Sequence, residues 1–289
     1  MDLHKIYHPI TATPFGGGGG YREYVPCPAL APYVRCFWSM GIPRGQGPDC
    51  GGETAVGQPR TCVVPDTCAD ILFQVDFGDN RFNSSFCGIS DRPFWTGIGR
   101  EEGDNGYVFA IRFYAWGAAL FAEESLRETC NGFLDAKQHF GKIRKEMEAC
   151  LFAVEDPAAL VPVAENILLK TLRPEQENGT VMGTVSQILQ KGGNLRIGEL
   201  VREMPVGSRQ MERLFREYVG VSPKKFCSLV RYQNLWRDIV CKSNQTDSGA
   251  QILDWVHKYG YADQAHLLRD FKKYHSMTVS QARAHACAL

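Results

Sequence analysis

Two stretches near the C-terminal end repeat one pattern of apolar residues, and this repeat constrains the fold more than any other feature. The first covers 197–204 and 208–215, and the second covers 252–260 and 263–271. In each, apolar residues at helical spacing predict a short helix, a tight turn and a second, amphipathic helix. Because this succession is typical of a helix-turn-helix unit, we predict two such units in an all-helical C-terminal third.

The second helix of each unit is expected to bury its apolar side and expose polar side chains. Ser208 and Asp263 are the expected N-caps. The side chains predicted to point outward are Arg209, Gln210, Glu212, Arg213, Arg216, Gln264, His266, Arg269 and Lys273. Arg and Gln suit bidentate contacts with guanine and adenine edges, so double-stranded DNA is the expected partner. For either helix alone, a solvated helix face is the plainer alternative.

A long helix from Ser222-Pro223 to about Val240 separates the two units. It would hold the two second helices a fixed distance apart. If both face one side of a DNA duplex, they should enter successive major grooves, about 34 Å apart.

The charge distribution favours the same partner. The chain is neutral overall, but residues 180–289 hold 16 Lys and Arg against 9 Asp and Glu, a net charge of +7. The remaining residues carry the compensating −7. A basic C-terminal third is typical of nucleic-acid binding, although an uneven surface without function is the alternative.

Segments 197–200, 211–215 and 220–223, followed by Gly260-Tyr261 and 267–271, resemble the AraC/XylS class of bacterial transcription regulators. The resemblance covers residues 180–289. It implies a seven-helix DNA-binding domain whose two recognition helices read the major groove, with RNA polymerase as a further partner. Its base-reading positions fall on Arg209, Gln210, Glu212, Arg213, Gln264, His266 and Arg269. Ala265 falls there too, but its side chain is too small for a polar base contact.

Four positions depart from the family pattern. Val201 replaces a small alanine, Pro205 stands where glycine is common, the segment around Ser276 lacks a glycine, and Val279 replaces a proline. None of them removes an outward polar group, so the resemblance holds.

The N-terminal half has the composition of short strands separated by turns. Aromatic and branched residues predict strands over 33–40, 71–77 and 107–113, which indicates a β-barrel or sandwich-like domain. Val63–Phe73 resembles a segment of uncharacterised N-terminal domains on some AraC-type regulators, which implies a barrel that senses a small-molecule effector. The run Gly16–Gly20 is expected to be a mobile loop.

Helical spacing follows over 116–126, 141–154, 157–172 and 181–191, the last ending at Gly192-Gly193. We therefore predict an α+β protein in three parts. Residues 1–172 form a β-rich effector-binding domain with trailing helices, residues 173–179 form a linker, and residues 180–289 form the tandem helix-turn-helix domain.

No catalytic constellation is present. The sequence lacks G-x-S-x-G, P-loop, H-E-x-x-H and dinucleotide motifs, and only His4 and His8 precede the helical half. We therefore expect no enzyme, no metal site and no cofactor. Turn hydrogen bonding is the expected role of Asp66 and Asp70. The candidate effector-binding residues are Trp38, Phe73, Trp95 and Arg112, with core packing as the alternative for the aromatic rings.

The chain has eleven cysteines, an odd number without any C-x-x-C pair. Buried thiols acting as small apolar residues are expected. The alternative is a redox or metal sensor that uses Cys62, Cys68 and Cys87. Some relatives of this DNA-binding domain carry cysteines as alkyl acceptors on zinc, but the spacing here does not supply that site.

No apolar run reaches the roughly 18 residues that a membrane span needs, and the start lacks a signal-peptide pattern. We expect a cytoplasmic protein, either monomer or homodimer, without membrane contact.

Overall fold

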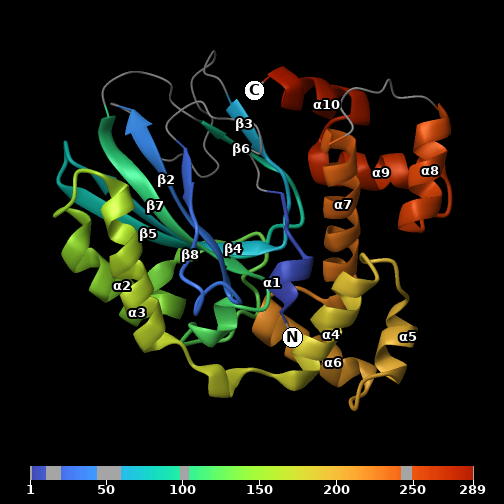
Figure 1. Ribbon diagram of the computed structural model, residues 1–289, viewed down its shortest axis with the longest axis horizontal. Coiled ribbons are helices and arrows are strands. Elements are labelled where there is room, and N and C mark those ends of the chain that lie inside the picture. The colour runs from blue at the N-terminus through green and yellow to red at the C-terminus, as the bar shows by residue number, and fades with distance from the viewer. Residues whose placement is uncertain (1, 11–20, 44–59, 98–103, 242–248, 289) are drawn as a thin grey trace.

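The computed structural model describes residues 2–10, 21–43, 60–97, 104–241 and 249–288. The run Gly16–Gly20 lies outside these ranges. The predicted α+β class is confirmed, with an N-terminal part built on sheets and helices and an all-helical C-terminal part (Figure 1).

Six antiparallel strands form the main sheet in the order β1-β2-β7-β4-β5-β8. Their bounds are β1 Arg22–Tyr24, β2 Val34–Pro43, β4 Cys68–Asp76, β5 Arg81–Cys87, β7 Asp104–Tyr114 and β8 Phe133–Asp135. The strands β3 (Arg60–Val63) and β6 (Phe94–Gly97) pair separately. Of the expected barrel or sandwich-like arrangements, the barrel needs correction. Over the described residues β1 and β8 are edges of an open sheet, and no pairing joins them.

The main sheet has two different faces because side chains alternate along each strand. On β4, Ile71, Phe73 and Val75 are fully buried, whereas the alternating Leu72 and Gln74 are partly exposed. The first set belongs to a core with α2 (Ala136–Leu151) and α3 (Leu160–Thr171). We call this side the helix-covered face, and the opposite side the second face.

The predicted helix over 116–126 is wrong. Only a single 3₁₀ turn, η1 (Ala118–Leu120), forms there. Nearly every residue from 116 to 122 is buried, including Trp116, Leu120 and Phe121. Apolar residues on all sides give no exposed helical face, so the segment packs as a turn after β7. The other short helices are α1 (Leu3–Ile6), η2 (Pro157–Ala159) and η3 (Pro174–Gln176).

Seven helices make up the described C-terminal part, as the resemblance implies. They are α4 Gly179–Gln190, α5 Ile197–Arg202, α6 Ser208–Val219, α7 Pro223–Cys241, α8 Gly249–Tyr259, α9 Gln264–His275 and α10 Val279–Ala288. Gly192 and Gly193, which follow α4, both have positive φ and stop the helix as predicted. No described helix is both long and apolar enough to span a bilayer.

The N- and C-terminal parts share one hydrophobic cluster. Buried residues of the helical part, such as Phe226 and Ile239, belong to the same cluster as Tyr7, Val64 and Trp116. The predicted linker is held to the N-terminal part, because the Arg173 backbone N–H donates to the carbonyl of Leu120 at 3.1 Å. The two parts are therefore packed together rather than joined by a free tether.

Candidate nucleic-acid interface

Helix α6 presents the predicted polar face. Met211 and Phe215 are buried, while Arg209 and Gln210 are exposed. The expected Ser208 cap is wrong: Gly207 occupies the N-cap position, Ser208 is the first helical residue, and no side chain caps the helix.

Four charged side chains of α6 form two ion pairs, and the two partners of each pair lie one helical turn apart. Arg213 contacts both carboxylate oxygens of Glu217, at 3.0 and 3.2 Å. Arg216 contacts Glu212 at 3.0 Å. Two predicted base-reading residues, Glu212 and Arg213, are thus already occupied within their own helix. These pairs have i,i+4 spacing, which is visible in the sequence.

Helix α9 differs from α6 in its N-cap and in the pairing of its exposed arginine. Asp263 is its N-cap, as predicted, and the Asp263 carboxylate accepts a hydrogen bond from the His266 backbone N–H at 2.7 Å. Gln264 and Arg269 are exposed. Within the described part of the chain, no carboxylate pairs with Arg269.

The His266 side chain contacts the turn that precedes α9. The Ala262 backbone N–H lies 3.3 Å from His266 Nδ1, and the ring meets Tyr261 edge-on with a centroid distance of 5.2 Å. The side chain is half-buried. Of the three predicted base-reading residues on α9, His266 is therefore the least free to move.

Both units are mounted on α7, the first at one end and the second at the other (Figure 1). The helix has 19 residues, which at 1.5 Å per residue gives a length of about 28 Å. This is close to the roughly 34 Å that separates successive major grooves on one side of DNA.

Two family models match separate parts of the chain. Residues 22–135 match the model of a domain of unknown function, DUF6597, and residues 200–285 match the model of a helix-turn-helix domain of the AraC type. Residues 200–285 are therefore an AraC-type helix-turn-helix domain, and the protein is a DNA-binding transcription regulator. This class is not enzymatic.

Solved structures of ToxT from Vibrio cholerae are also similar, at 10% sequence identity. A single-residue variant of ToxT from strain SCE256, in its apo form, has a TM-score of 0.39 and covers 78% of this chain and 93% of its own. ToxT from strain O395 also has a TM-score of 0.39, covering 80% and 96%. ToxT bound to an unsaturated fatty acid has a TM-score of 0.38, covering 78% and 91%. No curated protein matches this regulator.

The four candidate effector-binding residues do not lie together. Trp38 and Arg112 lie on the second face of the main sheet, on neighbouring strands. Phe73 must be removed from the set, because it is fully buried on the helix-covered face. Trp95 lies on β6 opposite Cys62, in the separate two-stranded sheet.

A cluster of hydrogen-bonded and charged side chains surrounds Arg112 on the second face. The guanidinium bonds the carboxylate of Asp66, and its other nitrogen lies 3.9 Å from Asp70. The indole N–H of Trp38 donates to Asp70 at 2.9 Å. Burial raises the pKa of Asp70 to about 7, although the Trp38 hydrogen bond opposes the shift. The expected turn role of Asp66 is also present, since its other oxygen accepts from the Cys68 backbone N–H.

Two of the three cysteines proposed as sensors, Cys62 and Cys68, are not activated. Burial raises the pKa of Cys62 to about 11, and burial together with the Asp70 charge raises the pKa of Cys68 well above its ordinary value. A reactive thiol needs the opposite shift. No group of three metal-binding side chains gathers among the described residues.

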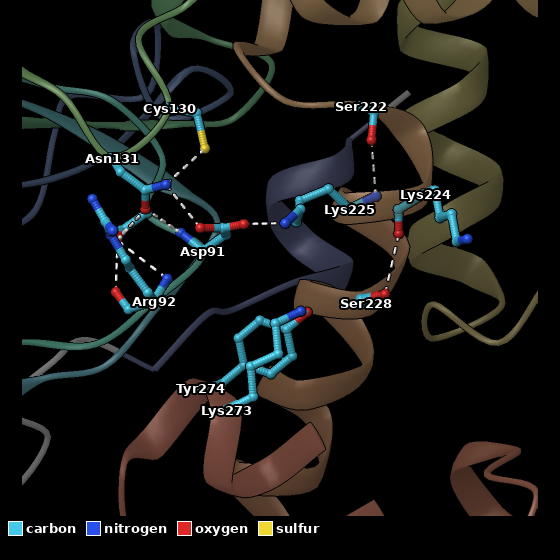
Figure 2. A network of polar contacts seen from close by, with 11 residues as sticks. Asp91, Arg92, Cys130, Asn131, Ser222, Lys224, Lys225, Ser228, Lys273 and Tyr274 are labelled. Carbon is cyan, nitrogen blue, oxygen red and sulfur yellow. Dashed lines mark hydrogen bonds and ion pairs between the residues drawn. The ribbon is translucent and has the colours of Figure 1, made fainter. Parts of the chain in front are cut away.

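Sequence reasoning missed the contacts between the N-terminal part and the helix-turn-helix units. The Lys225 ammonium at the start of α7 bonds the carboxylate of Asp91, which Asn131 also holds by a hydrogen bond of 2.8 Å (Figure 2). Burial alone would raise the pKa of Asp91, but the bonds from Lys225 and Asn131 outweigh it and lower that pKa. Nothing in the local sequence pairs residues 134 positions apart.

Further along α7, the Gln233 side chain donates to the carbonyl of Pro65 at 2.7 Å and accepts from the Ile10 backbone N–H at 2.8 Å. The N-terminal part also contacts the end of α6, where the Leu126 backbone N–H donates to the carbonyl of Glu217 at 2.9 Å. Beside this hydrogen bond lies a polar cavity of about 620 Å³, lined by the loop at 124–128, α2 and Glu217.

Proposed function

We propose that α6 and α9 read two successive major grooves of a specific operator. The residues proposed to contact bases are Arg209, Gln210, Glu212, Arg213, Gln264, His266 and Arg269. The observation that carries this proposal is the mounting of two outward-polar helices at the ends of one 19-residue helix. The division into residues 1–172, 173–179 and 180–289 belongs to the same proposal.

The N-terminal part is proposed to bind a small-molecule effector on the second face of the main sheet. Trp38 and Leu72 are partly exposed there, while Ala110 between them is fully buried. The Arg112–Asp66–Asp70 cluster lies at one end of the same face. A surface that combines apolar contact area with a few convergent polar groups suits a small ligand.

The effector is proposed to act through the contacts that reach α6 and α7. An effector changes DNA affinity only if it binds the DNA-competent and incompetent arrangements with different free energies. The bonds at Asp91–Lys225, Gln233 and Leu126–Glu217 would differ between the two arrangements, because they link the N-terminal part to α6 and α7.

The DNA-reading proposal is tested by selecting bound duplexes from a random-sequence pool with the full-length protein. Enrichment of one bipartite sequence, with half-sites about one helical turn apart, is expected. Binding of all duplexes with equal affinity would overturn sequence-specific reading.

The effector proposal is tested by native mass spectrometry of the purified protein, followed by DNA titration of loaded and stripped samples. A bound small molecule whose removal changes operator affinity is expected. Trp38→Phe should weaken its binding, while Phe77→Leu, at an exposed ring elsewhere on the N-terminal part, serves as the control. Equal operator affinity of the loaded and stripped protein would rule out the switch.

The coupling step has its own test. Asp91→Asn removes the charge that holds Lys225, so operator affinity should depend less on the effector. Asp79→Asn removes an exposed ion pair with Arg81 at the β4–β5 turn and is the matched control. An unchanged effector response in Asp91→Asn would show that this contact does not carry the coupling.

A further inference from the structure

The outward face of α9 contains an apolar patch between its polar residues. Gln264, Ala265, Leu268, Arg269 and Lys272 are all exposed, and their spacing places them along one side of the helix. Leu268 is 36% exposed, whereas its neighbour Leu267 is fully buried in the core. Ala265 and Leu268 are three residues apart, so their side chains are adjacent in the middle of this face.

Helix α6 has no such patch. Apart from Gly207 at its N-cap, its exposed positions hold only charged or polar side chains, namely Ser208, Arg209, Gln210, Glu212, Arg213 and Arg216. The two recognition helices therefore offer DNA different chemistry, although they occupy equivalent places in the two units.

We propose that Ala265 and Leu268 recognise thymine by apolar contact with its C5-methyl group. This inference rests on the proposed function, since it assumes that α9 enters the major groove. In that groove the thymine methyl is the one apolar group that a base edge presents. Gln264 and Arg269 border the patch and suit adenine and guanine, which places the thymine contacts within the base-reading surface rather than beside it.

The positive charge at the same face argues for DNA as the occupant. Arg269 and Lys272 lie directly beside Leu268, and both are exposed. A protein partner that covered a leucine patch would have to bury these cations as well. The phosphate backbone instead attracts them and brings the patch against the groove floor.

The test replaces thymine with deoxyuridine, which lacks only the methyl group. The operator selected from the random pool is first divided into half-sites, and the α9 half-site is the one where Arg269→Ala relaxes base preference. Each thymine there is then changed to deoxyuridine. At one or two positions the dissociation constant should rise about four-fold, as expected for one buried methyl group.

Leu268→Ala should bind the thymine and deoxyuridine duplexes equally at one of these positions, and Ala265→Gly should do so at the adjacent one. Leu253→Ala is the matched control, because Leu253 is an exposed leucine on α8 and should leave the methyl preference intact. A half-site without thymine, an unchanged dissociation constant with deoxyuridine, or the same methyl preference in Leu268→Ala would each overturn the inference. Failure to select any operator would instead overturn the proposed function.

Discussion

Helices α6 and α9 occupy equivalent positions in two repeats, yet they are built differently. Helix α6 has Gly207 at its N-cap, without a side-chain cap, and holds four of its charged residues in two ion pairs with one another. Helix α9 is capped by Asp263 and leaves Arg269 without a carboxylate partner in the described residues. One helix-turn-helix pattern can thus present a face whose charges are already paired and a face whose arginine is unpaired, so we expect the two helices to contribute unequally to DNA binding.

The interiors beneath the two helices differ as well. Phe271 of α9 packs among the rings of Tyr232, Trp236 and His275, with centroid distances of 6.0, 5.9 and 5.0 Å. Among the described rings, Phe215 of α6 packs against Phe226 alone, at 5.6 Å. Both phenylalanines are fully buried.

The largest effect is expected from truncating these two rings. Phe271→Ala and Phe215→Ala should each lower the free energy of unfolding by about 3–5 kcal/mol. Phe271→Ala should cost more, because it also removes aromatic contacts. Denaturant unfolding of both variants measures the difference, and an equal loss would show that the extra rings around Phe271 add nothing.

The second prediction concerns binding. Arg269→Ala should weaken operator binding by about 2–3 kcal/mol, near the upper end of what one base-reading arginine contributes. Arg213→Ala should cost only about 1 kcal/mol, because Arg213 must first leave Glu217. Titrations on operator and random DNA test this. Equal losses on the two DNAs would mean that the arginines contact phosphates instead of bases.

The third prediction removes the N-cap side chain of α9 and introduces one at the N-cap of α6. Asp263→Ala should lower stability by about 1 kcal/mol, since the first backbone N–H groups of α9 lose their acceptor. Gly207→Asp should raise stability by a few tenths of a kcal/mol, because the cap position has extended backbone and open space around the α-carbon. Thermal unfolding separates the two signs, and a destabilised Gly207→Asp would contradict the expected cap geometry.

The fourth prediction concerns the end of α9. Ser276 has φ of 58°, in the left-handed region, at the place where the family pattern has glycine. Ser276→Gly should therefore stabilise the protein by about 0.5–1 kcal/mol. The same measurement on Gly220→Ser, at the left-handed end of α6, should show destabilisation, since an added β-carbon would meet Thr129 at 2.8 Å. Loss of stability in Ser276→Gly would show that the left-handed backbone at Ser276 is not strained.

The smallest effect should come from freeing Arg213. Glu217→Gln removes an exposed ion pair worth about 0.3–0.5 kcal/mol and should strengthen operator binding by no more than that. Glu212→Gln, which frees Arg216 in the same way, is the matched comparison. Weaker operator binding by Glu217→Gln would show that Glu217 positions Arg213 for DNA instead of withholding it.

Sequence periodicity was sufficient where one face of an element is buried and the other exposed. It located β2, β4 and β7, the helices of both units, and the cap at Asp263. It failed over 116–126, where burial on all sides removes the periodic signal. It also missed β5, whose Asn83, Ser84 and Ser85 have little strand propensity and which is held in the sheet by pairing with β4.

For the candidate sites, the outward residues of α6 and α9 followed from helical spacing alone. The strand alternation that separates Phe73 from Trp38 and Arg112 was also present in the sequence, but the predicted effector set did not follow it. The bonds from Asp91 to Lys225 and from Gln233 to Pro65 had no local signal, because they depend on how two distant parts of the chain pack.

The hydrophobic cluster that joins Tyr7, Val64 and Trp116 to Phe226 and Ile239 has a consequence for how such a regulator evolves. Two halves that share an interior cannot be exchanged separately by recombination, because a new sensor would leave apolar surface on the DNA-binding half uncovered. We therefore expect the two halves to have changed together, with each substitution at the shared interior matched by one across it.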